Sequence, residues 1–372
     1  MKQLAGFEVG YLVKELQVLI GGKVDKIFNP DKKSILIQFY TRQAGKQILH
    51  ILAPNMLFLS PSKEESGEPT GLAMQLRKLL TNSRVKFVSQ IRFERVVEII
   101  FEVLEDDNSR QDYVLFIELF GSGNTILTKA GKIIAATEYR VYSTRSLKPG
   151  DKYVCPARDI NFLELTKEQL SGIFSKSTKE SVIKTLAIDL GLGGVYAEEL
   201  CLIAHIDKKF KLIGADDISK VYNAISELKA CKPMGSLIKD ADKLVDVVPI
   251  PLNFYSKYEL EEFSSYNEAL SKAVGMELAS KPKESPFEPK IKKVLQIIDE
   301  QKKTIDAYEN KAKEEQEKAE LIYANYALVE KLLADITTAK KKHSWEELKS
   351  LLKNHKIIKE INDKEGKIIL EL

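Results

Sequence analysis

The sequence has few of the residues and spacings that build metal centres. Among its 372 residues there are only three cysteines, Cys155, Cys201 and Cys231, and no C-x-x-C. This excludes a cysteine zinc site and gives no sign of a disulfide framework, so we expect a reducing compartment. The four histidines are scattered and have no ligand spacing such as H-x-x-x-H. We therefore predict neither a metal nor a cofactor.

Motifs of catalysis are also missing. The chain has no G-x-S-x-G nucleophile motif, no nucleotide loop of the form G-x-x-x-x-G-K and no G-x-G-x-x-G. The sequence thus offers no sign of an active site. We predict a binding or scaffold protein and not an enzyme.

Charge, length and hydropathy narrow the class of protein further. The net charge is only +3, so a nucleic-acid site would have to be a local patch. No stretch approaches the length of a membrane-spanning helix, and Met1-Lys2-Gln3-Leu4 does not begin a signal-peptide core. The length predicts about two to four folded units. We expect a cytoplasmic protein with no membrane partner.

Residues 1–150 have the pattern of an α+β domain. Apolar residues recur at helical spacing over residues 6–20 and end at Gly21-Gly22. Thr70 is suited to cap a second helix over residues 71–82. Short period-two segments joined by tight turns favour an antiparallel sheet that closes as a sandwich or a barrel. The strands expected from this pattern span residues 24–28, 34–40, 47–52, 113–120, 125–128 and 133–137.

One further strand is predicted over residues 90–101, and its apolar row contains an arginine. Arg95 has the same parity as Phe93 and Val97, whereas Glu94 would point to the other face. A charge that faces a core is costly unless it is paired or reaches water. Arg95 therefore pairs with a residue elsewhere, lies at a bend or lines a groove. A structural ion pair or a hairpin end is the alternative to a functional role.

Residues 151–240 are predicted to form a helix-hairpin-helix domain. Helical patterns over residues 182–190 and 195–204 flank Gly191-Leu192-Gly193-Gly194. Glycines in such a turn let backbone N–H groups and a helix N-terminus approach a phosphate, so Gly191, Gly193 and Gly194 are candidate phosphate-binding residues. The same glycines also suit the geometry of the turn alone, and both interpretations stay open.

The rest of the chain is predicted to be extended and then helical. Residues 241–286 form an extended connection and a short helix over 263–274, with Pro282 and Pro286 in a linker. Residues 287–340 are a coiled-coil arm, because Lys290–Ile336 has no Pro or Gly and apolar residues mark its two ends. Its middle, Glu309–Glu320, is almost wholly polar or Ala, so it should project into solvent or bind a charged partner.

Residues 341–372 are predicted to begin another domain, which is cut short at the tip of the coiled coil. Ser344 is suited to cap a helix over residues 345–352. A hairpin of residues 357–361 and 367–372 should follow. We expect the chain to be the N-terminal part of a longer protein, able to self-associate through the coiled-coil helix.

Six pieces of the chain, taken in order, resemble a known family. They are the N-terminal helix with its acidic residue, the segment with Glu94-Arg95, and residues 116–127 (FIELFGSGNTIL), 191–200 (GLGGVYAEEL), 263–270 (FSSYNEAL) and 322–326 (IYANY). Together they are similar to the NFACT family of ribosome-quality-control factors, NEMF and RqcH. Bacterial members were once labelled fibronectin-binding protein A. The resemblance runs along nearly the whole chain.

The resemblance implies a function. Members of this family bind the large ribosomal subunit with a stalled peptidyl-tRNA. They recruit aminoacyl-tRNA, chiefly alanyl, for template-free tail addition. The ribosome makes the peptide bond, so the factor is a tRNA-recruiting scaffold.

The resemblance also implies roles for single residues. The family's acidic residue in the first helix falls on Glu8 and its Asp-Arg pair on Glu94-Arg95, with Glu where Asp is usual; both features are needed for tail addition. Arg95 would line a groove that takes an extruded RNA element by charge and stacking. We add Arg77 and Arg84, basic residues on or just past the helix 71–82, to the predicted tRNA-binding set.

A second pair is implied to act on the ribosome. The family's Glu-Leu pair that is tied to ribosome association falls on Glu118-Leu119.

Two alternative functions follow from the same resemblance: a DNA- or RNA-binding protein related to formamidopyrimidine-DNA glycosylases, and a cell-surface adhesin. The N-terminal domain of the family resembles that of formamidopyrimidine-DNA glycosylases, which use an N-terminal proline followed by Glu and usually a C-terminal cysteine zinc finger. Here Lys2 and Gln3 occupy the nucleophile region and no such finger exists, so we do not expect glycosylase activity. The old fibronectin-binding label suggests a cell-surface adhesin, which no secretion signal supports.

Overall fold

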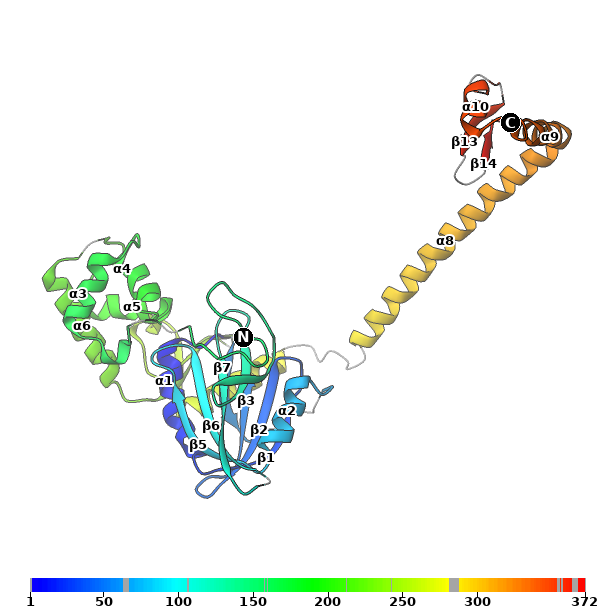
Figure 1. The fold of residues 1–372 in the computed structure, drawn as a ribbon. Helices are drawn as coiled ribbons and strands as arrows, with labels where there is room; N and C mark the ends of the chain where they lie inside the picture. The colour runs from blue at the N-terminus through cyan, green and yellow to red at the C-terminus, as the bar shows by residue number, and fades with distance from the viewer. Residues whose placement is uncertain are drawn as a thin grey trace. The chain divides into compact units, whose positions relative to one another are not determined.

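In the computed structural model the chain divides into two compact units, Met1–Lys281 and Pro282–Leu372 (Figure 1). The structure describes residues 2–62, 67–105, 107–156, 158, 160–211, 213–241, 243–280, 288–352, 355, 357–362 and 367–371. The predicted linker residues Pro282 and Pro286 and the tip of the last hairpin lie outside these ranges. The finer domain boundaries inferred from the sequence stay a prediction.

A nine-stranded antiparallel sheet, counted over the described residues, lies at the centre of the first unit. Its strand order is β4-β3-β2-β1-β5-β6-β7-β8-β9. The strands are β1 Lys23–Phe28, β2 Ser34–Thr41, β3 Gly45–Leu52, β4 Met56–Ser60, β5 Arg84–Gln90, β6 Val96–Leu104, β7 Arg110–Glu118, β8 Asn124–Lys129 and β9 Lys132–Ala136. The predicted α+β class with a large antiparallel sheet is confirmed, although β4 and most of β5 were not predicted.

The sheet folds back on itself between β1 and β5. These two strands share a single facing pair, Lys23 and Arg84. In a flat sheet β2 and β6, three strands apart, would be about 14 Å from each other. The rings of Phe39 on β2 and Phe101 on β6 nevertheless stack with centroids 6.5 Å apart. The two halves therefore enclose a shared core, which is the sandwich-like form of the prediction.

The predicted strand over residues 90–101 is wrong in its first half. β5 ends at residue 90 and β6 begins at residue 96, and the N–H of Ile91 donates to the carbonyl of Val96 at 3.0 Å. Arg95 thus lies at a hairpin end and not in a row that faces the core. The apolar alternation misled because Phe93 is buried in a different core, where its ring centroid is 4.7 Å from that of Phe162.

Helices and a small second sheet complete the first unit. α1 (Gly6–Glu15) continues as a 3-10 turn, and Thr70 caps α2 (Gly71–Leu80) as predicted. The other helices are α3 Lys167–Lys176, α4 Val182–Lys184 with a π turn at Thr185–Asp189, α5 Gly194–Ile203, α6 Ala215–Ala230 and α7 Tyr266–Ser280. Within the described residues, β10 (Gly235–Asp240), β11 (Lys243–Val248) and β12 (Glu259–Phe263) form a sheet of order β11-β10-β12.

The second sheet has a hydrophobic core on each face. Leu237 and Val247 belong to the core of the nine-stranded sheet, whereas the next residues, Ile238 and Val248, belong to the core of α3 to α6. Successive side chains of a strand point to opposite faces, so β10 and β11 lie between the two cores. Helix α1 also contributes side chains to both, and the two cores are therefore held in a fixed relation.

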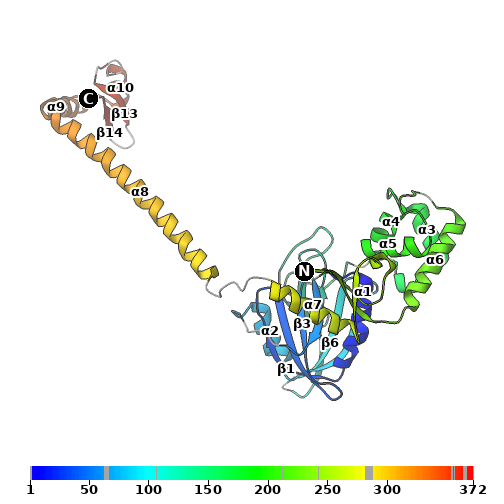
Figure 2. The same cartoon turned by 180° about the vertical axis from the view of Figure 1, so that it is seen from behind.

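Helix α7 covers the free edge of β4. Glu15 at the end of α1 accepts hydrogen bonds from the N–H groups of Tyr266 and Asn267 at 2.7 and 2.8 Å. The side-chain oxygen of Asn267 accepts from the N–H of Leu59 on β4 at 2.7 Å. α7 thus runs beside α1 across the sheet (Figure 2) and protects an edge that could otherwise pair with another chain.

The second unit begins with a long exposed helix. α8 spans Glu288–Ala324 and α9 spans Tyr326–Lys340, and they are separated at Asn325, whose φ of −112° and ψ of 27° are not helical. The prediction of one helix over Lys290–Ile336 is therefore wrong at this residue. Every described side chain of α8 is exposed, including the polar middle.

The end of the second unit is a small packed cluster. Leu332 and Ile336 of α9 pack with Ile358 of the terminal hairpin. Ser344 caps α10 (Trp345–Leu351), and β13 (Ile358–Asn362) pairs with β14 (Lys367–Leu370), as predicted. Over the whole described part of the chain, no helix is both long and apolar enough to cross a membrane.

We expect the amides in the middle of α8, residues 309–320, to exchange rapidly in dilute solution. Helices without tertiary packing are marginal in water, and all side chains of this stretch are exposed. Hydrogen exchange read by mass spectrometry would show this, with α5 as the slow reference. If the apolar ends of α8 pair with a second copy, protection will rise with protein concentration. Full protection in a monomer would contradict the prediction.

Candidate functional site

A buried carboxylate at the start of α1 joins three parts of the first unit. Glu8 is only 2% exposed. Its carboxylate accepts hydrogen bonds from the N–H of Ala5 at 2.8 Å and from the hydroxyl of Tyr196 on α5 at 2.9 Å. The ammonium of Lys2 binds the same carboxylate and, at 2.8 Å, that of Asp246 on β11. Glu8 is therefore a link inside the protein and not an exposed contact.

Burial and charge pairing oppose each other in this network: burial, together with the charge of Asp246, raises the pKa of Glu8 although the ammonium of Lys2 opposes the shift. Burial by itself would lower the pKa of Lys2, but Glu8 and Asp246 outweigh it and raise the pKa. Burial, and then the carboxylate of Glu8, raise the pKa of Tyr196 well above its ordinary value. The Tyr196 hydroxyl therefore stays protonated and donates a hydrogen bond to Glu8.

A pocket lies beside the network, between the residue 91–95 hairpin and the start of α5. Its walls come from segments far apart in the sequence: the N-terminal residues 2–6, the hairpin, the glycine turn and β11. The charged and turn residues that line it are Lys2, Glu8, Arg95, Arg158, Gly191, Gly193, Gly194 and Asp246. The fold thus brings together Glu8, Arg95 and the glycines that the sequence singled out separately.

Arg158 connects the hairpin to the glycine turn. Glu94 accepts hydrogen bonds from the N–H of Arg158 at 2.7 Å and from its guanidinium at 3.0 Å. Arg92 donates to the carbonyl of Arg158 at 2.6 Å. Gly191 has a φ of +73°, and a Cβ there would lie 2.3 Å from the Arg158 guanidinium. The positive φ favours glycine at position 191, and a larger residue there would also displace the Arg158 guanidinium from its place beside the turn.

Arg95 is a cation placed beside another cation. Among the described residues its guanidinium makes no hydrogen bond or ion pair, although its backbone carbonyl accepts from the N–H of Leu119 at 2.8 Å. Burial, followed by the charge of Arg158, lowers the pKa of Arg95, and Glu94 opposes this. A bound anion would relieve the repulsion between the two guanidinium groups.

The start of α5 adds a partial positive charge to the same pocket. Gly193, with a φ of +80°, occupies the N-cap position and has no side chain that could cap the helix. Gly194, Val195 and Tyr196 of the first turn line the pocket. The N–H groups at a helix start have no intrahelical partners and favour an anion. Chemically, the pocket is suited to a phosphate or a carboxylate.

Glu118 and Leu119 lie next to Arg95, but inside the protein. Glu118 faces Val96 across β6 and β7, and its side chain is 3% exposed. Arg145 donates to both of its carboxylate oxygens, one at 3.0 Å, and the hydroxyl of Tyr153 donates at 3.0 Å. Leu119 is fully buried. A role of this pair in partner binding must therefore pass through neighbouring residues such as Arg145.

Arg77 and Arg84 lie elsewhere. Arg77 on α2 donates to the carbonyl of Ile27 at 2.8 Å and to the side chain of Asn29 at 3.2 Å, which holds the end of β1. Arg84 begins β5 and donates to the carbonyl of Gly21 at 3.1 Å. Since β5 runs from residue 84 to 90, Arg84 is about 20 Å along the strand from the hairpin. The fold does not bring these two arginines to the pocket.

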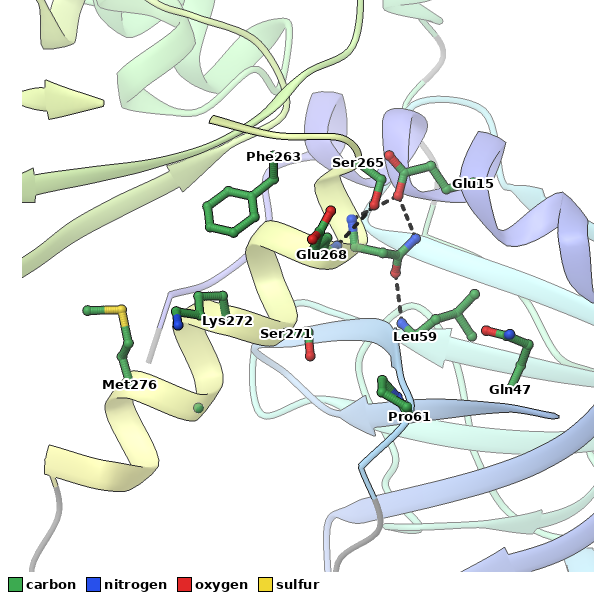
Figure 3. A pocket seen from close by; sticks show the side chains of 12 residues that line it. Glu15, Gln47, Leu59, Pro61, Phe263, Ser265, Glu268, Ser271, Lys272 and Met276 are labelled. Carbon is green, nitrogen blue, oxygen red and sulfur yellow. Dashed lines mark hydrogen bonds between the residues drawn. The ribbon is translucent and has the colours of Figure 1, made fainter. Parts of the chain in front are cut away.

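Sequence reasoning missed several residues of the site. Arg158 and Asp246 belong to no motif, and Lys2 was considered only as a departure from a glycosylase. Their roles arise from tertiary pairing, which leaves no local pattern. A larger groove between α7 and β4 (Figure 3) contains none of the expected site residues. Across the described residues, no cluster of three or more His, Cys, Asp or Glu could hold a metal ion.

Comparison with known proteins decides the family. A family model described as the NFACT N-terminal and middle domains matches residues 6–365. The chain belongs to this family. The archaeal Rqc2 homologue aRqcH of Methanocaldococcus jannaschii is 30% identical over 396 residues, which cover all of this chain and 58% of that protein. Human ribosome quality control complex subunit NEMF is 22% identical over 354 residues, 86% of this chain and 32% of its own length.

Solved structures share the fold of this NFACT-family chain. The N-terminal part of the fibronectin/fibrinogen-binding protein of Streptococcus suis has a TM-score of 0.59 and 22% identity, covering 73% of this chain and 99% of that one. The fibrinogen-binding protein of Staphylococcus aureus has a TM-score of 0.59 and 20% identity, covering 72% and 98%. At these identities the likeness establishes the fold alone.

We expect Arg145→Ala to lower the free energy of unfolding by about 3–5 kcal/mol, because it leaves the Glu118 carboxylate buried and unpaired. Arg110→Ala is the matched control, since Arg110 lies on β7, the strand of Glu118, and pairs with Glu102 on β6 but is 72% exposed; it should cost less than about 1 kcal/mol. Denaturant unfolding followed by circular dichroism measures both. Equal, small losses would show that the Arg145 pair is not needed for the fold.

Proposed function

We propose that this chain acts in ribosome-associated quality control, where it binds the large ribosomal subunit and recruits aminoacyl-tRNA for template-free tail addition. Membership of the NFACT family supports the general role, because relatives matched over the whole chain or most of it are named for ribosome quality control. In this proposal the ribosome makes the peptide bond. The chain is a scaffold that positions the tRNA.

The observation that supports tRNA binding most is Arg95 in the pocket, whose side chain has no pairing within the described part of the chain. Its guanidinium lies near that of Arg158 and near the open N-terminal turn of α5. Arginine forms paired hydrogen bonds to phosphate and stacks on exposed bases, which suits an extruded element of RNA. Together these groups would neutralise one phosphate of a tRNA and hold the base beside it.

The acidic residues of the site would act by positioning these cations. Glu94 holds Arg158 by two hydrogen bonds. Glu8 holds Tyr196 and thereby the first turn of α5. Neither carboxylate has to touch the RNA, where its charge would repel phosphate. The predicted roles of Glu8 and Glu94 in tail addition are thus compatible with their places inside the protein.

Glu118 and Leu119 would support ribosome binding in a similar way. Both are buried, and Glu118 holds Arg145, which in turn supports the loop that follows β9. Any contact with the large subunit would be made by exposed side chains near this buried pair and not by the pair itself.

We expect Arg95→Ala to weaken binding of the 372-residue chain to bulk tRNA about tenfold and to lower the slope of log K against log salt by about one. Fluorescence anisotropy at several salt concentrations measures both quantities. The control is Arg110→Ala, an exposed arginine at the opposite end of the β6–β7 pair, which should bind as wild type.

Arg158→Ala should resemble Arg95→Ala, whereas Glu94→Ala should weaken binding less, because it only releases Arg158. Arg77→Ala and Arg84→Ala test whether the wider predicted set takes part. The proposal for this pocket is refuted if the wild-type chain does not bind tRNA. It is also refuted if a folded Arg95→Ala variant binds tRNA with unchanged affinity. Thermal unfolding of each variant establishes that it is folded.

A further inference from the structure

An ordered hairpin with exposed aromatic side chains follows β9. Val141 and Ser146 form a β-bridge, and the N–H of Tyr142 donates to the carbonyl of Arg145 at 2.8 Å. At the base of the hairpin, the N–H of Leu147 donates to the carbonyl of Arg140 at 2.8 Å, and Leu147 is fully buried. Residues 138–147, here called the tyrosine hairpin, are thus a built element and not a loose loop.

The buried ion pair of Glu118 and Arg145 ties the tyrosine hairpin to β7. The guanidinium of Arg145 lies over the ring of Phe120 at 5.7 Å and over that of Tyr142 at 5.2 Å from the centroids. Tyr142 nevertheless stays 40% exposed, and Tyr139 is 51% exposed. A protein that fixes an aromatic ring and leaves it open to solvent offers a stacking surface at low entropic cost.

The charges around the hairpin indicate an anionic partner. Among the described residues from 139 to 158, the exposed charged side chains are all cationic: Arg140, Lys148, Lys152 and Arg158. The carboxylates nearby are only partly exposed and engaged: Glu138 pairs with Arg140 at 2.7 Å, and Asp151 accepts from the backbone of Lys148. A surface of cations and open tyrosines fits RNA better than it fits a protein partner of mixed charge.

The tyrosine hairpin is linked to the Arg95 pocket through a short stretch of chain. Arg145 donates to the carbonyl of Val154 at 3.2 Å. From Val154 the chain leads within four residues to Arg158, which Glu94 and Arg92 hold beside the pocket. One RNA segment could therefore contact both places.

We propose that the tyrosine hairpin is a second contact for the RNA bound at the pocket, in which Tyr142 and Tyr139 stack on unpaired bases. Lys148 and Lys152 hold the phosphates next to those bases. The inference rests on the proposed function, which places tRNA in the pocket. It adds an aromatic surface that stacks on the rings of unpaired bases and does not discriminate between their sequences.

The test uses the 372-residue chain with two probes, bulk tRNA and a labelled single-stranded oligouridine. Tyr142→Ala should weaken binding to both about tenfold, as removal of one stacking contact does, and it should leave the salt slope unchanged because no phosphate contact is lost. Tyr142→Phe should restore binding, since the ring is kept. Lys148→Ala should instead lower the salt slope by about one.

Two further variants make the result decisive. Tyr139→Ala should also weaken binding, and Tyr139 makes no ring contact in the described structure, so its loss leaves the support of the hairpin intact. Tyr40→Ala is the control, because Tyr40 on β2 is also exposed, at 53%, but lies away from the pocket. It faces Lys23 on β1, which in turn faces Arg84 at the start of β5. The variant should bind as wild type.

The outcomes separate this inference from the proposed function. If Arg95→Ala loses affinity while both tyrosine variants bind as wild type, the stacking inference is wrong and the pocket proposal stands. If none of the variants changes affinity, both are wrong. If the tyrosine variants bind both RNA probes as wild type does but no longer cosediment with the large ribosomal subunit, the hairpin contacts the subunit and not the RNA bound at the pocket, and the inference is overturned.

Discussion

The carboxylate of Glu8 is the point at which three parts of the first unit meet. It binds the start of its own helix, the hydroxyl of Tyr196 on α5 and the ammonium of Lys2, which reaches Asp246 on β11. A buried charge is tolerated only when such partners are complete, and removal of one partner typically costs about 3–5 kcal/mol. The two cores on either side of β10 and β11 are therefore locked into one arrangement, and so are the walls of the pocket beside Glu8.

The acidic and the basic residues of the site have different roles. The acidic residues Glu8, Glu94 and Glu118 are bound to partners within the protein: Glu8 and Glu94 hold Lys2 and Arg158, which line the pocket, and Glu118 holds the buried Arg145. Of the three cations that line the pocket, Lys2, Arg95 and Arg158, only Arg95 makes no side-chain pairing within the described chain. Burial lowers the pKa of Arg95, and the charge of Arg158 lowers it further. The site thus presents positive charge from a rigid frame, which is what recognition of a phosphate requires.

Local patterns predicted most of the fold, because alternation and capping are local signals. Thr70, Ser344 and most strand positions were placed correctly for that reason. The prediction of a strand over residues 90–101 was wrong in its first half because Phe93 is buried in another core, and no local pattern tells which of two cores a residue joins. Family resemblance selected Glu8 and Arg95, but not Arg158. Arg158 lies more than 60 residues from Glu94 in the sequence, and only the fold brings the two residues into contact.

Ultraviolet cross-linking of bulk tRNA to the chain, with cross-linked peptides identified by mass spectrometry, tests the central claim most directly. The account predicts cross-links within residues 91–95, 154–158 and 191–196, with the tyrosine hairpin as a further site. Cross-links confined to the α2 face around Arg77 or to the exposed length of α8 would contradict it. In that case the network around Glu8 would serve the fold, and the RNA would bind on another surface.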